Sequence, residues 1–379
     1  MVKKSLLAVF LSVLLTVLAV LPVGAVSPTT VSAPAAVLME ASTGKILFEK
    51  NPHEKRPCAS ITKVMTLILV FEAIDSGKLK LSDQITASEH AASMGGSDIW
   101  LEEGESMSAD DMIKATVVAS ANDAAVALAE QISGSEEAFV QQMNQKAKKL
   151  GMKDTVFKNC NGLDEDGHIT SAYDVALMSR ELIRHKKVFD YTSVWLDQLR
   201  GGKTQIVNTN KLLKSYKGIT GLKTGTTDDA GCCISATAQR GDMSLIAVVL
   251  GADTGKQRFA DAAALLNFGF AEYSVLELKA PKELPESVKV NGGMKKEVKI
   301  SCKVNGKLVT RTATADELKM TSEVPNELDA PLKQNQKIGS VTYTMGKETG
   351  EFPVVAAETV EKITFPHVFG VLIQSLLTL

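Results

Sequence analysis

The hydrophobic pattern of this 379-residue chain changes its period near residue 275, and this change restricts the folds that the chain can adopt. Before that point, helical patterns cover residues 61–76, 109–119, 123–132 and 172–185, and short apolar runs at 36–39, 46–48 and 244–250 predict strands. After Pro281, apolar and polar residues alternate from Val298 to Val304, as in half-buried strands. We therefore predict an α+β domain over residues 26–275 and a small all-β domain over residues 276–362.

The predicted β domain also contains a turn signal. Asn305 and Gly306 follow the alternating run and precede Leu308, which predicts a hairpin that joins two neighbouring strands. Short apolar segments around residues 338–343 and 352–355 predict further strands.

The N-terminal segment has the layout of a cleavable signal peptide. Lys3 and Lys4 precede an uncharged stretch at residues 6–21, and Gly24 and Ala25 supply the small residues that a signal peptidase requires. We predict that residues 1–25 are removed and that the protein is exported. The alternative is a retained membrane-spanning helix.

The C-terminal segment, residues 363–379, also contains no charged residue. On a helix, its larger apolar residues share one face and its polar or small residues lie on a narrow opposite face: Phe365, Val368, Phe369, Leu372 and Leu376 against His367, Gly370, Gln374 and Thr378. Because the segment is short for a bilayer and keeps a polar stripe, we predict an amphipathic anchor on the membrane surface. The alternative is a last helix packed on the protein's own core.

Charge and metal-binding residues exclude several classes of partner. The 42 basic and 44 acidic residues give a net charge of -2, which provides no basic excess for nucleic acid. The five histidines show no ligand spacing, so we predict no metal and no cofactor.

The five cysteines are Cys58, Cys160, Cys232, Cys233 and Cys302. Their number is odd, and the adjacent pair would point to opposite faces of a strand. We predict buried free thiols.

Ser60 and Lys63 stand at the start of a segment that is apolar nearly all round from Ile61 to Ile74, which indicates a helix buried within a domain. Residues three apart share one helix face. Burial disfavours the charged form of a lysine and lowers its pKa, so Lys63 could accept the proton of Ser60. Ser60 would then be a nucleophile at a helix N-terminus, where free N–H groups stabilise an oxyanion.

This spacing is weak evidence by itself, because Ser42 and Lys45 match it in what reads as a polar hairpin turn. Two further segments carry similar chemistry. Ser120, Ala121 and Asn122 interrupt an alanine-rich helical region, and residues 223–225 (Lys-Thr-Gly) stand at the head of a predicted strand. Taken singly, the first is also typical of a capped helix break and the second of a strand that enters a turn.

Together and in this order, the three segments resemble the signature of penicillin-recognising active-site serine enzymes. The resemblance is strongest to the low-molecular-mass D-alanyl-D-alanine carboxypeptidases of the penicillin-binding protein 5 type, and it includes residues 59–65, 167–174, 208–212 and 218–231. It implies a β-lactamase/transpeptidase-like domain, in which helices cover both faces of an antiparallel sheet, followed by the β domain and the amphipathic tail. It also implies covalent binding of β-lactam antibiotics and removal of the terminal D-alanine from peptidoglycan stem peptides, at the outer face of the cytoplasmic membrane or in the cell wall.

The resemblance also implies roles for single residues. Ser60 would be the nucleophile, Lys63 its base, and Ser120 the group that protonates the departing D-alanine. The residues implied to bind substrate are Asn122, Lys223, Thr224, Gly225, Thr226 and Arg258, and the backbone N–H groups of Ser60 and Thr226 would form the oxyanion hole. His168 reads as structural, and Ala121 replaces the glycine that is commoner in this family.

Three alternatives remain open from the sequence. A class A β-lactamase would need a deacylating glutamate, but no Glu-x-x-Leu-Asn segment follows Asn122. A non-catalytic peptidoglycan-binding protein would be expected to lack part of the signature, which is complete here. A DD-endopeptidase would use the same residues.

Overall fold

The computed structural model describes residues 31–304, 306–346 and 348–377. The chain divides into two compact units, with the boundary in the sequence between Tyr273 and Ser274. Each unit is described by itself below. The predicted signal peptide, residues 1–25, lies outside the described residues.

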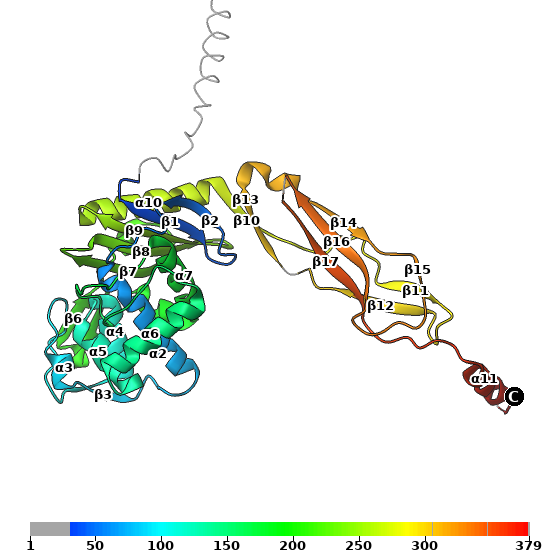
Figure 1. The fold of residues 1–379 in the computed structure, drawn as a ribbon, viewed down its shortest axis with the longest axis horizontal. Coiled ribbons are helices and arrows are strands. Elements are labelled where there is room, and N and C mark those ends of the chain that lie inside the picture. Colours follow the sequence, from blue (N-terminus) through cyan, green and yellow to red (C-terminus); the bar gives the residue numbers. More distant parts are fainter. Residues whose placement is uncertain (1–30, 305, 347, 378–379) are drawn as a thin grey trace, which may run out of the picture. The chain divides into compact units, whose positions relative to one another are not determined.

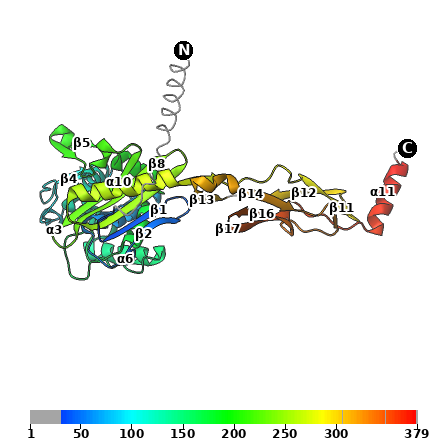
Figure 2. The same cartoon turned by 90° about the horizontal axis from the view of Figure 1, so that it is seen from above.

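The first unit contains a five-stranded antiparallel sheet in the order β2 (Ile46–Lys50), β1 (Ala35–Glu40), β9 (Met243–Ala252), β8 (Gly231–Arg240) and β7 (Ile219–Thr227). Helix α10 (Gly255–Glu272) covers one face, and the helical layer that includes α2 and α7 covers the other (Figures 1 and 2). A strand covered on both faces is apolar along its whole length. This explains the unbroken apolar run at residues 245–250, which is entirely buried.

The helices of this layer have the following bounds: α2 Lys63–Asp75, α3 Glu89–Ala92, α4 Ala109–Lys114, α5 Asn122–Ser133, α6 Glu136–Leu150, α7 Ala172–Leu182, α8 Phe189–Thr192 and α9 Leu212–Ser215. Helix α2 is buried on nearly every side, as its apolar sequence predicts. Helix α6 follows the N-cap Ser135, whose hydroxyl accepts a hydrogen bond from the Ala138 amide, and it ends at Gly151. The unit also contains two small two-stranded antiparallel sheets, β3 (Gln84–Thr86) with β4 (Ser106–Ser108) and β5 (Leu196–Leu199) with β6 (Thr204–Val207).

The second unit consists mainly of β structure. Its strands are β10 (Tyr273–Glu277), β11 (Ser287–Asn291), β12 (Glu297–Cys302), β13 (Lys307–Arg311), β14 (Lys319–Glu323), β15 (Glu327–Asp329), β16 (Lys337–Met345) and β17 (Glu348–Ala356). Six of them form one sheet in the order β14, β16, β17, β12, β11, β15. A small aliphatic core that includes Val298, Leu332, Val341 and Val354 lies beneath it.

The hairpin predicted at Asn305 and Gly306 is wrong. Strand β12 pairs with β11 and β17, whereas β13 pairs with β10 in a separate two-stranded sheet. Strands β12 and β13 therefore belong to different sheets. Asn305 itself lies outside the described residues. A turn-forming dipeptide specifies a local change of direction, but it does not specify which strand the next segment joins.

The C-terminal segment forms helix α11 (Phe365–Leu377). Several of its large apolar side chains are exposed, among them Phe365 at 80% and Leu377 at 81%. Within the described residues, no helix is both long enough and apolar enough to cross a membrane.

Candidate active site

Ser60 lies in a single 3-10 turn, Ala59–Thr62, that leads directly into α2 at Lys63. The lysine side chain is fully buried, and its Nζ atom lies 3.0 Å from Ser60 Oγ. The same nitrogen lies 2.5 Å from Asn122 Oδ1 and 2.7 Å from the carbonyl oxygen of Asn161. The structure thus brings the predicted serine and lysine together and gives the lysine two further partners.

Burial lowers the pKa of Lys63 from 10.5 to about 7, although Cys160 and Asp123 oppose this shift. A lysine with such a pKa is partly neutral at physiological pH. The side chain can therefore act as a base, as the apolar sequence around it predicts.

The Ser-Ala-Asn segment lies where the helix that begins with α4 ends. After Lys114 the helix widens into one π-helical turn, Ala115–Ala119, and Ser120 then adopts a left-handed backbone conformation with φ 63°. This reversal allows Asn122 to begin α5. The Asn122 side chain donates to the Gly95 carbonyl oxygen through Nδ2, which turns its oxygen toward Lys63. Both Ser120 and Asn122 are buried, at 4% and 3% exposure.

The Lys-Thr-Gly segment lies in the middle of β7 and not at the head of a strand as predicted, because the pairing with β8 continues to Thr227 opposite Gly231. Lys223 is 1% exposed and donates to Ser120 Oγ at 2.8 Å. Its pKa is lowered well below the ordinary value, first by burial and then by the charges of Lys63 and Arg258. The site therefore holds a second amine whose charged form is destabilised.

Arg258, in the first turns of α10, is buried rather than a surface arginine. Its Nη1 atom donates to the Gly225 carbonyl oxygen at 2.8 Å and to Thr226 Oγ1 at 2.7 Å, and its buried Nε has no protein partner. Thr224 donates to Thr209 Oγ1 at 2.6 Å. The residues predicted to bind a carboxylate thus lie around one strand, and Thr209 joins them.

Close approach of β7 to the start of α2 depends on Gly225. A Cβ atom at this position would lie 2.9 Å from the Ser60 amide nitrogen and 2.7 Å from the Cys58 carbonyl oxygen. A side chain there would separate the strand from Ser60. The glycine of the motif is therefore required by packing.

Sequence reasoning missed the 159–163 loop, residues Asn159–Leu163, which supplies the Asn161 carbonyl group to Lys63. Gly162 has φ +89°, and a Cβ atom there would lie 2.0 Å from the Ala59 carbonyl oxygen. The loop is therefore in direct contact with the turn that carries Ser60. The sequence signal for this loop is the Asn-Gly pair at residues 161–162. This pair predicts a tight turn but does not indicate which segment the turn contacts.

The remaining candidates lie outside the reactive group. Ser42 donates to Glu40 in the β1–β2 turn, as expected for the chance match. His168 is buried, contacts Thr62 Oγ1 at 2.8 Å and has its pKa lowered to about 4 by burial. All five cysteines are free, as predicted; three are buried, whereas Cys232 and Cys302 are partly exposed.

This sheet order, the contact of Ser60 with the buried Lys63, and the neighbouring Ser-x-Asn and Lys-Thr-Gly segments define the class of penicillin-recognising serine enzymes. Residues 23–254 match the peptidase S11 family of D-alanyl-D-alanine carboxypeptidases, and residues 273–362 match the C-terminal domain of penicillin-binding protein 5. The chain therefore belongs to the D-alanyl-D-alanine carboxypeptidase family.

Individual relatives agree with this assignment. The chain is 43% identical over 338 residues to the D-alanyl-D-alanine carboxypeptidase DacF of Bacillus subtilis (strain 168), and the alignment covers 88% of this chain and 87% of DacF. It superposes on penicillin-binding protein 5 from Haemophilus influenzae with a TM-score of 0.77 and 32% identity, over 89% of this chain and 99% of that one. Penicillin-binding protein D2 from Listeria monocytogenes, solved in its ampicillin-bound form, matches with a TM-score of 0.59 and 36% identity, over 64% of this chain and 98% of that one.

Proposed function

We propose that this protein removes the terminal D-alanine from peptidoglycan pentapeptide stems through an acyl-enzyme on Ser60, with Lys63 as the base. The observation that carries this proposal is the set of partners of the Lys63 amine. Asn122 Oδ1 and the Asn161 carbonyl oxygen can only accept hydrogen bonds, so each takes one N–H. A neutral amine has two N–H groups and one lone pair, which leaves the lone pair for Ser60 Oγ at 3.0 Å.

Acylation then follows from this geometry. Ser60 Oγ forms a bond to the carbonyl carbon of the penultimate D-alanine, and its proton passes to Lys63 Nζ. The C–N bond to the last D-alanine breaks, and the departing amine takes a proton from Ser120, which Lys223 contacts at 2.8 Å. Ser120 regains this proton from the protonated Lys63. Water later cleaves the ester and restores Ser60.

The tetrahedral oxyanion would be bound by the backbone N–H groups of Ser60 and Thr226. The contact that Gly225 permits between β7 and the Ser60 turn supports this assignment. Asn122, with its side chain fixed between Lys63 and Gly95, would hold the substrate amide.

The free carboxylate of the substrate would bind at Lys223, Thr224 and Arg258. Burial is the largest cause that lowers the pKa of both Lys223 and Arg258, and the charge of Arg258 further lowers that of Lys223. A bound carboxylate offsets that penalty, because an opposite charge stabilises the protonated amine. Substrates with a free terminal carboxylate would therefore be preferred.

A class A β-lactamase is disfavoured by the missing glutamate segment. A non-catalytic peptidoglycan-binding protein is disfavoured by the complete signature, in which Lys63 contacts Ser60 and Lys223 contacts Ser120. A DD-endopeptidase remains the second candidate for the same site. Release of free D-alanine from a soluble pentapeptide tests for the carboxypeptidase directly, whereas cleavage of cross-linked dimers alone would identify the endopeptidase.

The nucleophile is tested with labelled penicillin followed by digestion and mass spectrometry. We expect a covalent adduct on the peptide that contains Ser60 and no adduct in Ser60→Ala. Ser42→Ala is the matched control, because it removes the serine of the chance Ser-x-x-Lys match, and it should label normally. An adduct on Ser120 would contradict the assignment.

We further propose that residues 1–25 direct export and that α11 attaches the protein to the outer face of the cytoplasmic membrane. The exposed apolar side chains of α11, Phe365, Phe369 and Leu377, support an interfacial helix. Deletion of residues 363–379 should move the protein out of the membrane fraction while D-alanine release from a soluble pentapeptide persists. Retention of the truncated, signal-cleaved protein in the membrane fraction would contradict the anchor.

A further inference from the structure

We propose that Glu136 is a positioning residue that keeps Lys63 in the geometry of a base by fixing the 159–163 loop. This inference rests on the proposed role of Lys63. Glu136 itself lies outside the reactive group, in the first turn of α6.

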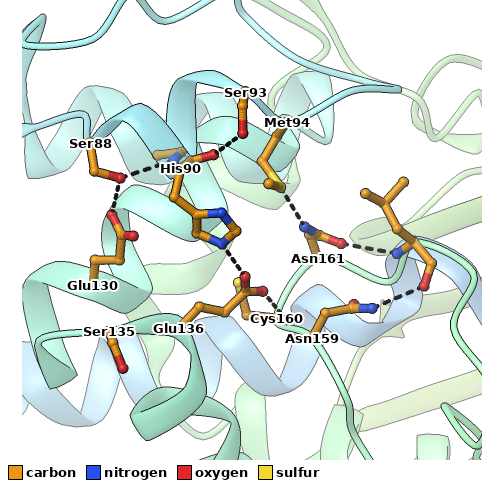
Figure 3. Close-up of polar contacts among 12 residues, drawn as sticks. Ser88, His90, Ser93, Met94, Glu130, Ser135, Glu136, Asn159, Cys160 and Asn161 are labelled. Carbon is orange, nitrogen blue, oxygen red and sulfur yellow. Dashed lines mark hydrogen bonds and ion pairs between the residues drawn. The ribbon is translucent and has the colours of Figure 1, made fainter.

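The Glu136 carboxylate connects two segments that are distant in the sequence (Figure 3). One oxygen accepts the Cys160 backbone N–H at 2.9 Å, and the other lies 2.7 Å from His90 Nε2 in α3. The Glu136 side chain is only 13% exposed. A hydrogen bond from a backbone N–H to a carboxylate is stronger than one between neutral groups, and water has little access to replace it here.

The contact lies at the first of three consecutive peptide groups that are each held in place. The N–H of Cys160 is bound by Glu136, the carbonyl oxygen of Cys160 accepts from Thr66 Oγ1 at 2.5 Å, and the carbonyl oxygen of Asn161 accepts from Lys63 Nζ at 2.7 Å. Thr66 and Lys63 are three residues apart on α2. The backbone of the loop is therefore fixed between the α6 carboxylate and the α2 side chains.

Removal of the Glu136 carboxylate leaves the Cys160 N–H without this partner at a buried position. The peptide groups that follow can then shift, and the Asn161 carbonyl group moves away from Lys63. The amine loses one of the two acceptors that direct its lone pair, and water that enters the gap stabilises its charged form. Both the acylation rate and the pKa of Lys63 should change, the pKa upward.

His90 requires a separate control because its imidazole is also a titratable group in contact with Glu136. Its hydrogen bond to Glu136 raises its pKa, burial opposes this, and the charges of Glu136, Glu130 and Glu137 add to the increase. Asp123 and Cys160 are the corresponding groups that act on Lys63. A pH profile of Glu136 variants must therefore be read beside that of His90→Ala.

The experiment measures the second-order rate of acylation by a fluorescent penicillin across pH 5 to 10 for the full chain, with thermal melting as a check of folding. We expect Glu136→Ala to lower the plateau rate by roughly tenfold or more and to move the acid midpoint of the profile to higher pH. Glu136→Gln should keep the rate within about threefold, because its amide oxygen still accepts the Cys160 N–H. Glu137→Ala removes the neighbouring exposed carboxylate of the same helix turn and should match the wild type, and His90→Ala should keep the wild-type acid midpoint.

Four results would overturn the inference: a wild-type rate in Glu136→Ala, a lower rate with an unmoved acid midpoint, equal losses in the Gln and Ala variants, or a shifted midpoint in His90→Ala. If Glu136→Ala does not fold, Glu136→Asp replaces it, because the shorter side chain cannot reach both partners and should give the same direction of change. Failure of the wild type to acylate at Ser60 would instead contradict the proposed function.

Discussion

The two units of the protein bury different kinds of side chains. Among the described residues, the first unit contains every buried charged side chain and all the buried polar ones except Thr310. The second unit has an aliphatic core, and its ion pairs, such as Lys289 with Glu327 and Lys337 with Glu351, lie at the surface.

Burial of a charged or polar group is unfavourable unless the group is hydrogen-bonded. In the first unit, Lys63 and Lys223 are both hydrogen-bonded. Burial nevertheless lowers the pKa of each, so their charged forms remain unfavourable. The second unit contains no comparable arrangement within its described residues. The contrast indicates that chemistry belongs to the first unit, and that substitutions in the two units should separate activity from stability.

The largest effect should come from Lys63→Arg. An arginine keeps the positive charge but cannot be deprotonated in a protein, so it cannot accept the Ser60 proton. We expect acylation by penicillin to fall by about a thousandfold, which is within the range for loss of a general base. Lys223→Arg, which keeps a cation for the carboxylate, is the comparison, and it should lose less. Equal losses would show that Lys63 acts through its charge alone.

A smaller but still large loss is expected for Gly162→Ala. The new Cβ atom would overlap the Ala59 carbonyl oxygen and push the 159–163 loop away from the Ser60 turn. Gly134→Ala is a matched control, since Gly134 has a similar φ of +82° but no atom within 4 Å of the added Cβ. We expect acylation rates about tenfold to a hundredfold lower for Gly162→Ala and near the wild type for Gly134→Ala. Similar rates in the two variants would contradict the close contact.

The pH dependence of acylation should report the pKa of Lys63. Because the neutral amine is the base and its pKa is about 7, the rate should fall with decreasing pH below about 7, by roughly tenfold for each pH unit. Stopped-flow acylation with a penicillin that does not titrate in this range provides the measurement. A rate that stays constant from pH 8 to pH 5 would exclude a neutral lysine as the base.

The smallest effect on activity should accompany a large effect on stability in the second unit. Leu332→Ala truncates a side chain that is 2% exposed in the aliphatic core, which should cost about 2 to 5 kcal/mol of unfolding free energy. Acylation should remain within about twofold of the wild type, and calorimetry should show the loss. A matching loss of acylation would mean that the two units do not separate activity from stability.

The sequence was sufficient for the features that depend on local patterns. The all-round apolar helix, the proximity of Ser60 to Lys63 and the two-unit organisation follow from hydrophobic period and spacing. The role of Lys-Thr-Gly was suggested by its order with the other two segments, although each segment alone has a common structural explanation.

The remaining features depend on contacts between distant residues. Nothing near Asn161 or Glu136 in the sequence indicates that the Asn161 carbonyl group meets Lys63, 98 residues away, or that Glu136 holds the Cys160 N–H. Every residue has a backbone carbonyl group, so a sequence motif cannot indicate which carbonyl oxygen accepts a hydrogen bond from Lys63. The incorrect prediction of a hairpin at residues 305–306 has the same origin, because strand pairing depends on contacts throughout the sheet and not on the local turn sequence.

The burial of Lys63 also couples folding to proton release. Its pKa is about 7 in the folded protein and 10.5 for an exposed lysine, so between these values the unfolded chain binds more protons than the folded one. The contribution of this residue to stability therefore rises as the pH increases from about 7 to 10.5, and below about 7 the folded protein carries the full penalty of a buried ammonium group. Comparison of chemical denaturation at pH 7 and pH 9 for the wild type and Lys63→Met would measure this coupling, and the variant should show a smaller increase. Acidic conditions that protonate Lys63, and so prevent it from acting as a base, would thus also destabilise the folded protein.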